Sequence, residues 1–314
     1  MRNRTMLALL AGLIVLAVLA AAAKAMHASS WGQAQKIDEI AGNSSELNTT
    51  FQDGCPIQSP DGRSLYLASN RPRFAGDTRT DLDIWVAHRT SKKAPWGAPV
   101  NLGEPVNSTA DDFCPTPIRG KGLFFVSRKT TAESCGLGDI YFTRQHQGGW
   151  REPTHLACAP EGPNSALDEQ GPSYVKAKRH ALLYFSSSSA TVPGDIYVSE
   201  RRDGSFGPAS PVVELNSAGN DIQPNVRRDG REVVFSSNRP GTLGAQDIWV
   251  STRRHLHDAW SEPVNLGEAI NTAVSESRPS LSRDALTLLF GRAPGPEGSG
   301  DIFVSTRTLK HSKH

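Results

Sequence analysis

The stretch Asp83-Ile84-Trp85-Val86 (DIWV) decides the fold, because the same phrase returns four more times along the chain. The copies read DIWV, DIYF, DIYV, DIWV and DIFV and begin at Asp83, Asp139, Asp195, Asp247 and Asp301. The steps between them are 56, 56, 52 and 54 residues. A fixed period near fifty residues is typical of repeat architectures. A residue that occurs in every copy usually builds the unit, so we look for chemistry where the copies differ.

Each copy contains four extended segments separated by turn residues. The first ends near a proline, a turn such as Ser59-Pro60-Asp61-Gly62 follows, and an apolar run such as LYLAS from Leu65 comes next. The DI phrase is the third segment, and an aromatic residue such as Trp96 begins the fourth. These short runs are rich in β-branched and aromatic residues and are bounded by Gly, Pro, Asn and Asp, which is typical of strands. Four strands per repeat predict a propeller blade.

The two chain ends predict how the ring closes. The fifth copy ends with DIFVSTRT at Thr308 and has no fourth segment, whereas Trp31–Ile37 stands alone before the first copy and resembles Trp96–Leu102. We therefore predict an all-β, five-bladed β-propeller of four-stranded antiparallel blades, in which the N-terminal strand (about Trp31–Ile37) completes the last blade. Such pairing leaves no open sheet edge. Residues 26–314 would then form a single propeller domain.

The N-terminus predicts export. Arg2 and Arg4 precede an apolar stretch from Met6 to Ala23, and the A-x-A match at 23–25 is typical of a secretory signal. We expect a signal peptide over residues 1–25, with cleavage after Ala28 or an uncleaved anchor as alternatives. The protein would then be periplasmic or secreted, in a bacterial envelope, with no membrane contact beyond this signal.

Cysteine and charge usage narrow the classes of site and partner. An exported chain with four cysteines favours disulfides, and among the three pairings of Cys55, Cys114, Cys135 and Cys158 we favour Cys135 with Cys158. No CxxC or Cys/His cluster occurs, so we expect no metal site and no cofactor. The 34 basic and 32 acidic residues give a formal net charge of +2 without a basic stripe, which argues against nucleic acid. We expect a monomer.

The repeats resemble a known family. SPDG at Ser59, SNRP at Ser69 and Ser237, and the recurrent DIWV resemble the WD40-like repeats of TolB-type propellers, over nearly all of the mature chain. The resemblance implies the propeller and is weak for function. The third copy has Lys176-Ala177-Lys178-Arg179 where the SPDG turn belongs, and the N-terminal domain of TolB is absent. The role of TolB itself is therefore not carried over.

A recurrent carboxylate gives the candidate site. It stands three residues before each marker proline, and an arginine follows the second strand in four copies, with Ser188 in the third. By the resemblance, the acids ring one mouth of the channel, where like charges need compensation. The arginines can form a structural lattice with them, or the mouth can hold a cation or a polar ligand. The candidate ligand-binding residues are Asp53, Asp112, Glu169, Asp221, Glu276, Arg71, Arg128, Arg239 and Arg292.

Two functions are compatible with this ring. We predict a non-enzymatic binding or scaffold module for a protein, peptide or glycan at the channel mouth, with the long basic loop from Arg71 to Arg79 suited to an anionic partner. The alternative is a carbohydrate-active glycoside hydrolase that uses a pair of the carboxylates. Asp112 and Glu169 are then the catalytic candidates, because each stands beside a second acid. A scaffold should show five similar arginine–carboxylate pairs, whereas an enzyme should show acids free of arginine in an open pocket.

Overall fold

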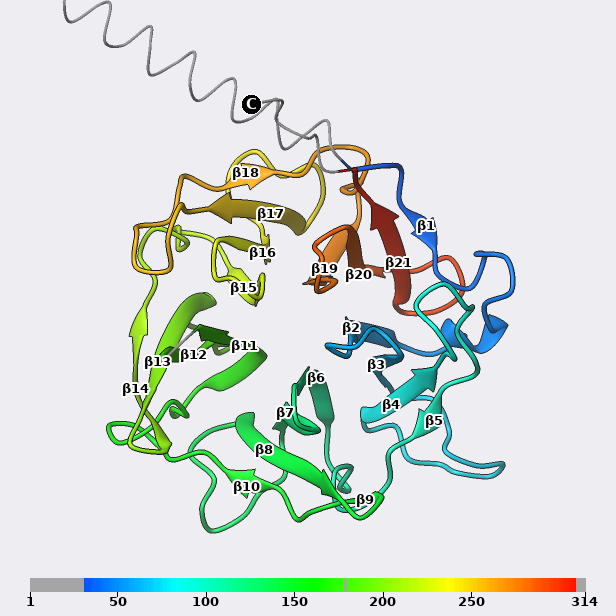
Figure 1. Cartoon of the computed structure of the whole chain (residues 1–314), viewed down its shortest axis with the longest axis horizontal. Helices are drawn as coiled ribbons and strands as arrows, with labels where there is room; N and C mark the ends of the chain where they lie inside the picture. Colours follow the sequence, from blue (N-terminus) through cyan, green and yellow to red (C-terminus); the bar gives the residue numbers. More distant parts are fainter. Residues whose placement is uncertain (1–30, 178–179, 309–314) are drawn as a thin grey trace, which may run out of the picture.

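Five small sheets surround a central channel (Figure 1). The computed structural model describes residues 31–177 and 180–308, so the expected signal peptide lies outside the described residues. Apart from the three-residue 3-10 turn η1 (Ser45–Leu47), the regular structure of these residues is β-strand. Each sheet has at least four antiparallel strands, which confirms the predicted five-bladed propeller. None of the described helices has the length and apolar character needed to span a bilayer.

The blades follow one another along the chain. Blade 1 contains β2 (Asp53–Gln58), β3 (Ser64–Ser69), β4 (Asp83–His88) and β5 (Val100–Asn101). Blade 2 contains β6 (Asp112–Ile118), β7 (Gly122–Ser127), β8 (Asp139–His146) and β10 (Thr154–His155), with β9 (Gly149–Trp150) also paired to β8. Blade 3 contains β11 (Asp168–Ala177), β12 (His180–Ser188), β13 (Asp195–Arg202) and β14 (Ser205–Pro211). Blade 4 contains β15 (Asp221–Val226), β16 (Glu232–Ser237), β17 (Asp247–Thr252) and β18 (Val264–Asn265). Every DI phrase begins the third strand of its blade.

The fifth blade joins the two ends of the chain. It consists of β19 (Ser275–Leu281), β20 (Thr287–Ala293), β21 (Asp301–Thr306) and the N-terminal β1 (Gln35–Lys36). Gln35 lies opposite Val304 in antiparallel register, and the Gly32 amide donates to the Thr306 carbonyl at 2.9 Å. Figure 1 shows β1 and β21 side by side. The prediction that the N-terminal strand closes the ring is therefore confirmed.

Cross-strand aromatic pairs form much of the core. Phe125, Phe185 and Phe290 on the second strands are almost fully buried. Each lies opposite the aromatic residue of the neighbouring DI phrase, and their ring centroids are 5.9, 6.1 and 5.9 Å from those of Tyr141, Tyr197 and Phe303. Such pairs bury large apolar area and favour one register. The DI aromatics are therefore structural.

An asparagine clamp ties each blade to the next. Asn107 accepts a hydrogen bond from the Ile84 amide at 2.8 Å and donates to the Ile84 carbonyl at 3.0 Å. The other four blades repeat this contact through the pairs Asn48–Ile302, Asn164–Ile140, Asn216–Ile196 and Asn271–Ile248. We did not expect the clamp from the sequence, although the pattern Asn-(Ser/Thr)-x-x-x-(Asp/Glu) recurs at all five places.

The inner strands carry a bulge just before the marker proline, at a position whose residues differ between blades. The register between first and second strands shifts there in every blade. The residue before each marker proline has a φ between 49° and 59°. For a residue other than glycine this left-handed conformation costs about 1 kcal/mol or more. The five residues, all of which line the middle of the channel, are Cys55, Cys114, Gly171, Gln223 and Arg278.

Candidate functional site

The five ring carboxylates are buried turn caps. Asp221 accepts hydrogen bonds from both the amide and the hydroxyl of Ser217, at 2.5 and 2.7 Å. The equivalent Ser or Thr, four residues earlier, binds the acid in every other blade. All five acids are at most 1% exposed. In this conformation they do not line the mouth as exposed ligand-binding groups, because their oxygens already accept hydrogen bonds inside the protein.

Three of the arginines form structural pairs with the ring. Arg71 binds Asp53, Arg239 binds Asp221, and the Nε atom of Arg292 lies 2.7 Å from Oε1 of Glu276. A guanidinium group of the protein itself thus stands beside these three carboxylates, at the place where the sequence suggested a bound metal cation or polar ligand. The arrangement is a lattice within each blade in three of the five copies.

Asp112 and Glu169 are the ring acids without an arginine partner. Burial raises the pKa of Asp112 to about 6 and that of Glu169 to about 7, against the opposing effect of hydrogen bonds from nearby serines. Oδ1 of Asp112 also has no hydrogen-bond partner among the described residues. Both side chains are 0% exposed. They satisfy half of the criterion for catalytic acids, since they are free of arginine but do not face an open pocket.

The acids next to them in sequence, Asp111 and Asp168, share one arginine instead. Arg128 does not bind Asp112; its guanidinium lies 3.0 Å from Asp111 and 2.8 Å from Asp168. The side chains of Asp111, Asp168 and Arg128 are 30%, 9% and 40% exposed. Asp168 is buried together with Glu169, whereas of the other doublet only Asp112 is buried and Asp111 stays partly exposed. The sequence singled out both doublets, and the structure brings Asp111 and Asp168 together at Arg128.

A small polar cavity lies over this group. It has a volume of about 300 Å³ and lies at the end of the channel where the inner strands begin. Asp168 also accepts a hydrogen bond from Gln170 at 2.9 Å. Because one guanidinium group reaches both Asp111 and Asp168, their carboxylates lie closer than about 10 Å, the upper limit for glycosidic hydrolysis by two carboxyl groups. The cavity is lined by Gln52, Asn70, Thr80, Leu82, Asp111, Phe113, Arg128, Gln170 and Arg278.

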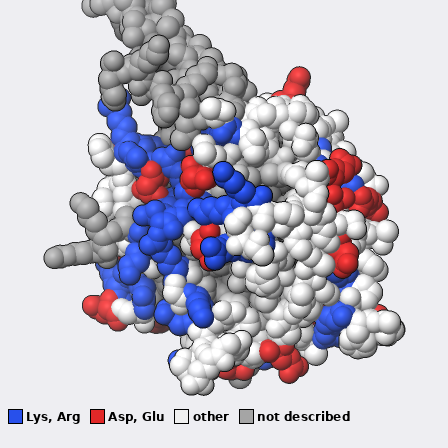
Figure 2. All heavy atoms as spheres, turned by 45° about the vertical axis from the view of Figure 1, so that its right-hand side comes forward, with Lys and Arg blue, Asp and Glu red and all other residues white. Residues whose placement is uncertain are grey.

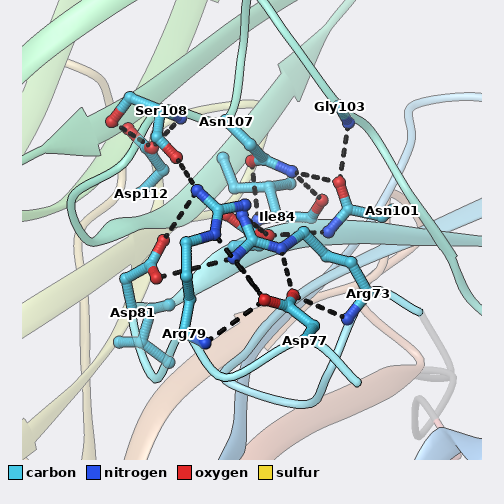
Figure 3. A network of polar contacts seen from close by, with 12 residues as sticks. Arg73, Asp77, Arg79, Asp81, Ile84, Asn101, Gly103, Asn107, Ser108 and Asp112 are labelled. Carbon is cyan, nitrogen blue, oxygen red and sulfur yellow. Dashed lines mark hydrogen bonds and ion pairs between the residues drawn. The ribbon is translucent and has the colours of Figure 1, made fainter. Parts of the chain in front are cut away.

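The long loop of blade 1, which forms one wall of this cavity, is internally neutralised. Figure 3 shows Arg73 and Arg79 turned toward Asp77 and Asp81. Nε of Arg73 lies 2.6 Å from Asp77, and Nη1 of Arg79 lies 3.7 Å from Asp81 and donates to the Ser108 carbonyl at 3.1 Å. Both arginines are already paired, so the loop does not offer the free positive charge that its sequence suggested for an anionic partner.

The expected disulfide is present. Cys135 and Cys158 are bonded, with their Cα atoms 5.6 Å apart, while Cys55 and Cys114 are free and buried. Cys135 also lies close to Asp139 and His155, and Nε2 of His155 is 3.0 Å from Oδ2 of Asp139. A disulfide sulfur cannot act as a thiolate ligand, so this group is not a metal site in the oxidised protein.

Comparison with known proteins gives structural matches only. No family model and no curated protein matches the chain. Among solved structures, the catalytic domain of the GH62 α-L-arabinofuranosidase from Coprinopsis cinerea matches with a TM-score of 0.57 and 11% identity, over 89% of this chain and 97% of that one. The α-L-arabinofuranosidase from Lactobacillus brevis matches with a TM-score of 0.52 and 13% identity, over 82% and 90%. The GH43 endo-arabinanase from Bacillus licheniformis matches with a TM-score of 0.51 and 12% identity, over 81% and 93%.

These matches correct two predictions. At such identities the likeness shows the fold alone, and the three propellers reported above are named as arabinofuranosidases and an endo-arabinanase. The assignment of the repeats to the TolB type is therefore wrong. The prediction of a non-enzymatic binding or scaffold module, which rested on the fivefold recurrence of the ring residues, is overturned as well, because the matched propellers are named as enzymes. SPDG turns and DI phrases build blades in general, which is why they misled the family assignment.

Proposed function

We propose that this protein is a glycoside hydrolase whose active site is the cavity lined by Asp111 and Arg128, with Asp168 behind the lining residues Arg128 and Gln170. The observation that carries the proposal is the sharing of one guanidinium by two carboxylates from neighbouring blades, at the edge of an open cavity. The solved propellers with this fold include enzymes named for arabinofuranosidase and endo-arabinanase activity. We therefore expect a glycan substrate that contains pentose units.

The two acids have different surroundings, which suits different roles. Glycosidic hydrolysis needs one carboxyl group that protonates the leaving oxygen and one carboxylate that activates water or attacks the anomeric carbon. Asp111 is the more exposed, and we assign it the carboxylate role. Asp168 is almost buried, and we assign it the role of the group that faces the leaving oxygen. Arg128 positions both groups and can bind a sugar hydroxyl.

The Cys135–Cys158 disulfide supports an extracytoplasmic site of action, because disulfides persist in oxidising compartments. We therefore propose that the enzyme works in the periplasm or outside the cell, where polymeric glycans are accessible. The residues expected to direct export lie outside the described part of the chain.

The test is a hydrolysis screen of the purified protein with aryl pentosides, arabinan and arabinoxylan. We expect turnover of at least one substrate, and a loss of about 10²-fold or more in kcat for Asp111→Asn and for Asp168→Asn. Asp229→Asn, which changes a carboxylate on a distant hairpin, should leave kcat unchanged. Absence of turnover across the panel, or variants at 111 and 168 that keep the wild-type kcat, would refute the proposal.

A further inference from the structure

A second, wider cavity lies at the other end of the channel. It has a volume of about 890 Å³ and is lined by the ends of the inner strands and by the hairpins that follow them. The inner strand β6 connects the two sites, since Phe113 lines the small cavity and Ile118 lines the wide one. A ligand of several sugar units fits a volume of this size.

The rim of the wide cavity is strongly basic. Seven cationic side chains line it, and no Asp or Glu does so, although the formal net charge of the whole chain is only +2. Figure 2 shows Lys and Arg gathered in one broad area of the surface. The cations of the cavity are Arg119, Arg144, Lys176, Arg201, Arg227, Arg228 and Arg283.

Most of these charges have no acidic partner among the residues that the structure describes. Arg227 binds Asp229 and Glu232 at 2.8 and 2.9 Å. The other six form no ion pair within the described residues, and every Asp and Glu of the chain belongs to those residues. Solvated surface charges usually alternate in sign, as they do in the blade 1 loop. A cavity that collects like charges is unfavourable unless an anion binds there.

The wall of the same cavity includes an aromatic cluster, in which Phe142 and Tyr174 are partly exposed and Phe124 and Phe206 are buried. The ring of Phe124 packs 4.7 Å from Phe142, 5.5 Å from Tyr174 and 5.8 Å from Phe206, measured between centroids. These residues come from blades 2 and 3, so the cavity extends from the channel mouth into the gap between them. The guanidinium of Arg144 lies 5.8 Å from the Phe142 ring centroid. Flat apolar surface beside guanidinium groups suits a ring that carries carboxylates, because arginine binds carboxylate in a bidentate manner.

We propose that the wide cavity is a binding site for an acidic oligosaccharide, in which Phe142 and Tyr174 pack against sugar rings and the arginines bind uronate carboxylates. The choice of a sugar rests on the proposed function, whereas the need for negative charge rests on the cavity alone. The site lies at the opposite end of the channel from Asp111 and Asp168. It would hold an acidic region of a polymer without using the candidate catalytic residues.

The experiment is a calorimetric titration of the full-length protein with tetragalacturonate, a neutral arabinotetraose and inorganic phosphate. Tetragalacturonate should bind at 20 mM salt, and its affinity should fall steeply as salt rises, since the contacts are exposed ion pairs. Arg119→Gln combined with Arg228→Gln should weaken this binding by about tenfold or more. Arg202→Gln is the matched control, because Arg202 lies next to Arg201 but binds Glu200 and does not line the cavity.

Three results would overturn the proposal. Arabinotetraose could bind as tightly as tetragalacturonate, the double variant could keep the wild-type affinity, or phosphate at equal concentration could displace the oligosaccharide and reveal a site for simple anions. Each readout is binding, so it stands apart from the hydrolysis test. Turnover without uronate binding removes only this inference, and uronate binding without turnover removes only the proposed function.

Discussion

Glu169 makes the stability of the propeller depend on pH in an unusual direction. Burial raises the pKa of this carboxyl from its ordinary 4.5 to about 7. Between these two values the folded protein keeps a proton that the unfolded chain has already released. The free energy of unfolding should therefore fall as pH rises from about 4.5 to about 7 and then level off. The raised pKa corresponds to about 3 kcal/mol of stability that is present below pH 4.5 and absent above pH 7.

The substitution Glu169→Gln isolates this effect. Glutamine does not titrate and keeps an oxygen that can accept the hydrogen bonds of Ser165 and Ser187. It loses the second acceptor, which binds the Ser165 amide, and this gives an offset that does not vary with pH. In urea denaturation at pH 4.5, 6 and 8, the wild type minus variant difference should decrease by about 3 kcal/mol from the lowest to the highest pH.

A matched control is Glu262→Gln, which changes an exposed glutamate. Its stability profile should run parallel to that of the wild type. If the profile of Glu169→Gln is also parallel to the wild type, the Glu169 carboxyl is ionised in the folded state. The account of this residue as a buried, proton-holding cap would then be refuted.

Three further perturbations test the scaffold. Asn271→Ala leaves the buried amide and carbonyl of Ile248 unpaired, so it should lower the free energy of unfolding, measured in urea, by about 2–4 kcal/mol. The control is Asn238→Ala, at an exposed position. A loss in Asn271→Ala no larger than that of the control would contradict the clamp. Trp31 is 6% exposed and packs in the core of blades 4 and 5, so Trp31→Ala should cost about 3–5 kcal/mol and deletion of 31–37 should lower the melting temperature of the whole ring. An unchanged melting temperature would show that the N-terminal strand does not close it. Cys55 and Cys114 are free but buried. Without reductant, a thiol reagent should therefore label no cysteine in the native protein and two cysteines after unfolding. Rapid labelling of the native protein would show that the channel is open to solvent.

The architecture could be predicted from the sequence because it repeats. A phrase that recurs every fifty-odd residues identifies a strand five times, and the unpaired segment at Trp31 identifies the closing strand. The pairing of Cys135 with Cys158 could also be predicted, since both flank the third strand of one repeat. The clamp asparagines were equally periodic, but an Asn before a Ser or Thr is common in turns, and only the contacts reveal its role.

The site could be predicted less well, because it depends on contacts between blades. Asp111 and Asp112 are adjacent in sequence, and which of them is exposed depends on folded contacts, since Ser108 binds Asp112 and Arg128 binds Asp111. The seven cations of the wide cavity come from all four of the blades 2 to 5. In the sequence, each of these cations taken alone is indistinguishable from an ordinary solvated surface residue. The charges of the loop from Arg71 to Arg79 were visible in sequence, but their neutralisation by Asp77 and Asp81 is a property of the folded loop.

The central claim is that a glycan is cleaved between Asp111 and Asp168. The most direct measurement is a crystal structure of the Asp111→Asn variant soaked with an arabino-oligosaccharide. The account predicts sugar density in the cavity beside Arg128, with a glycosidic oxygen within hydrogen-bond distance of Asp168. An empty cavity, with no sugar or with sugar bound only at another surface, would contradict it.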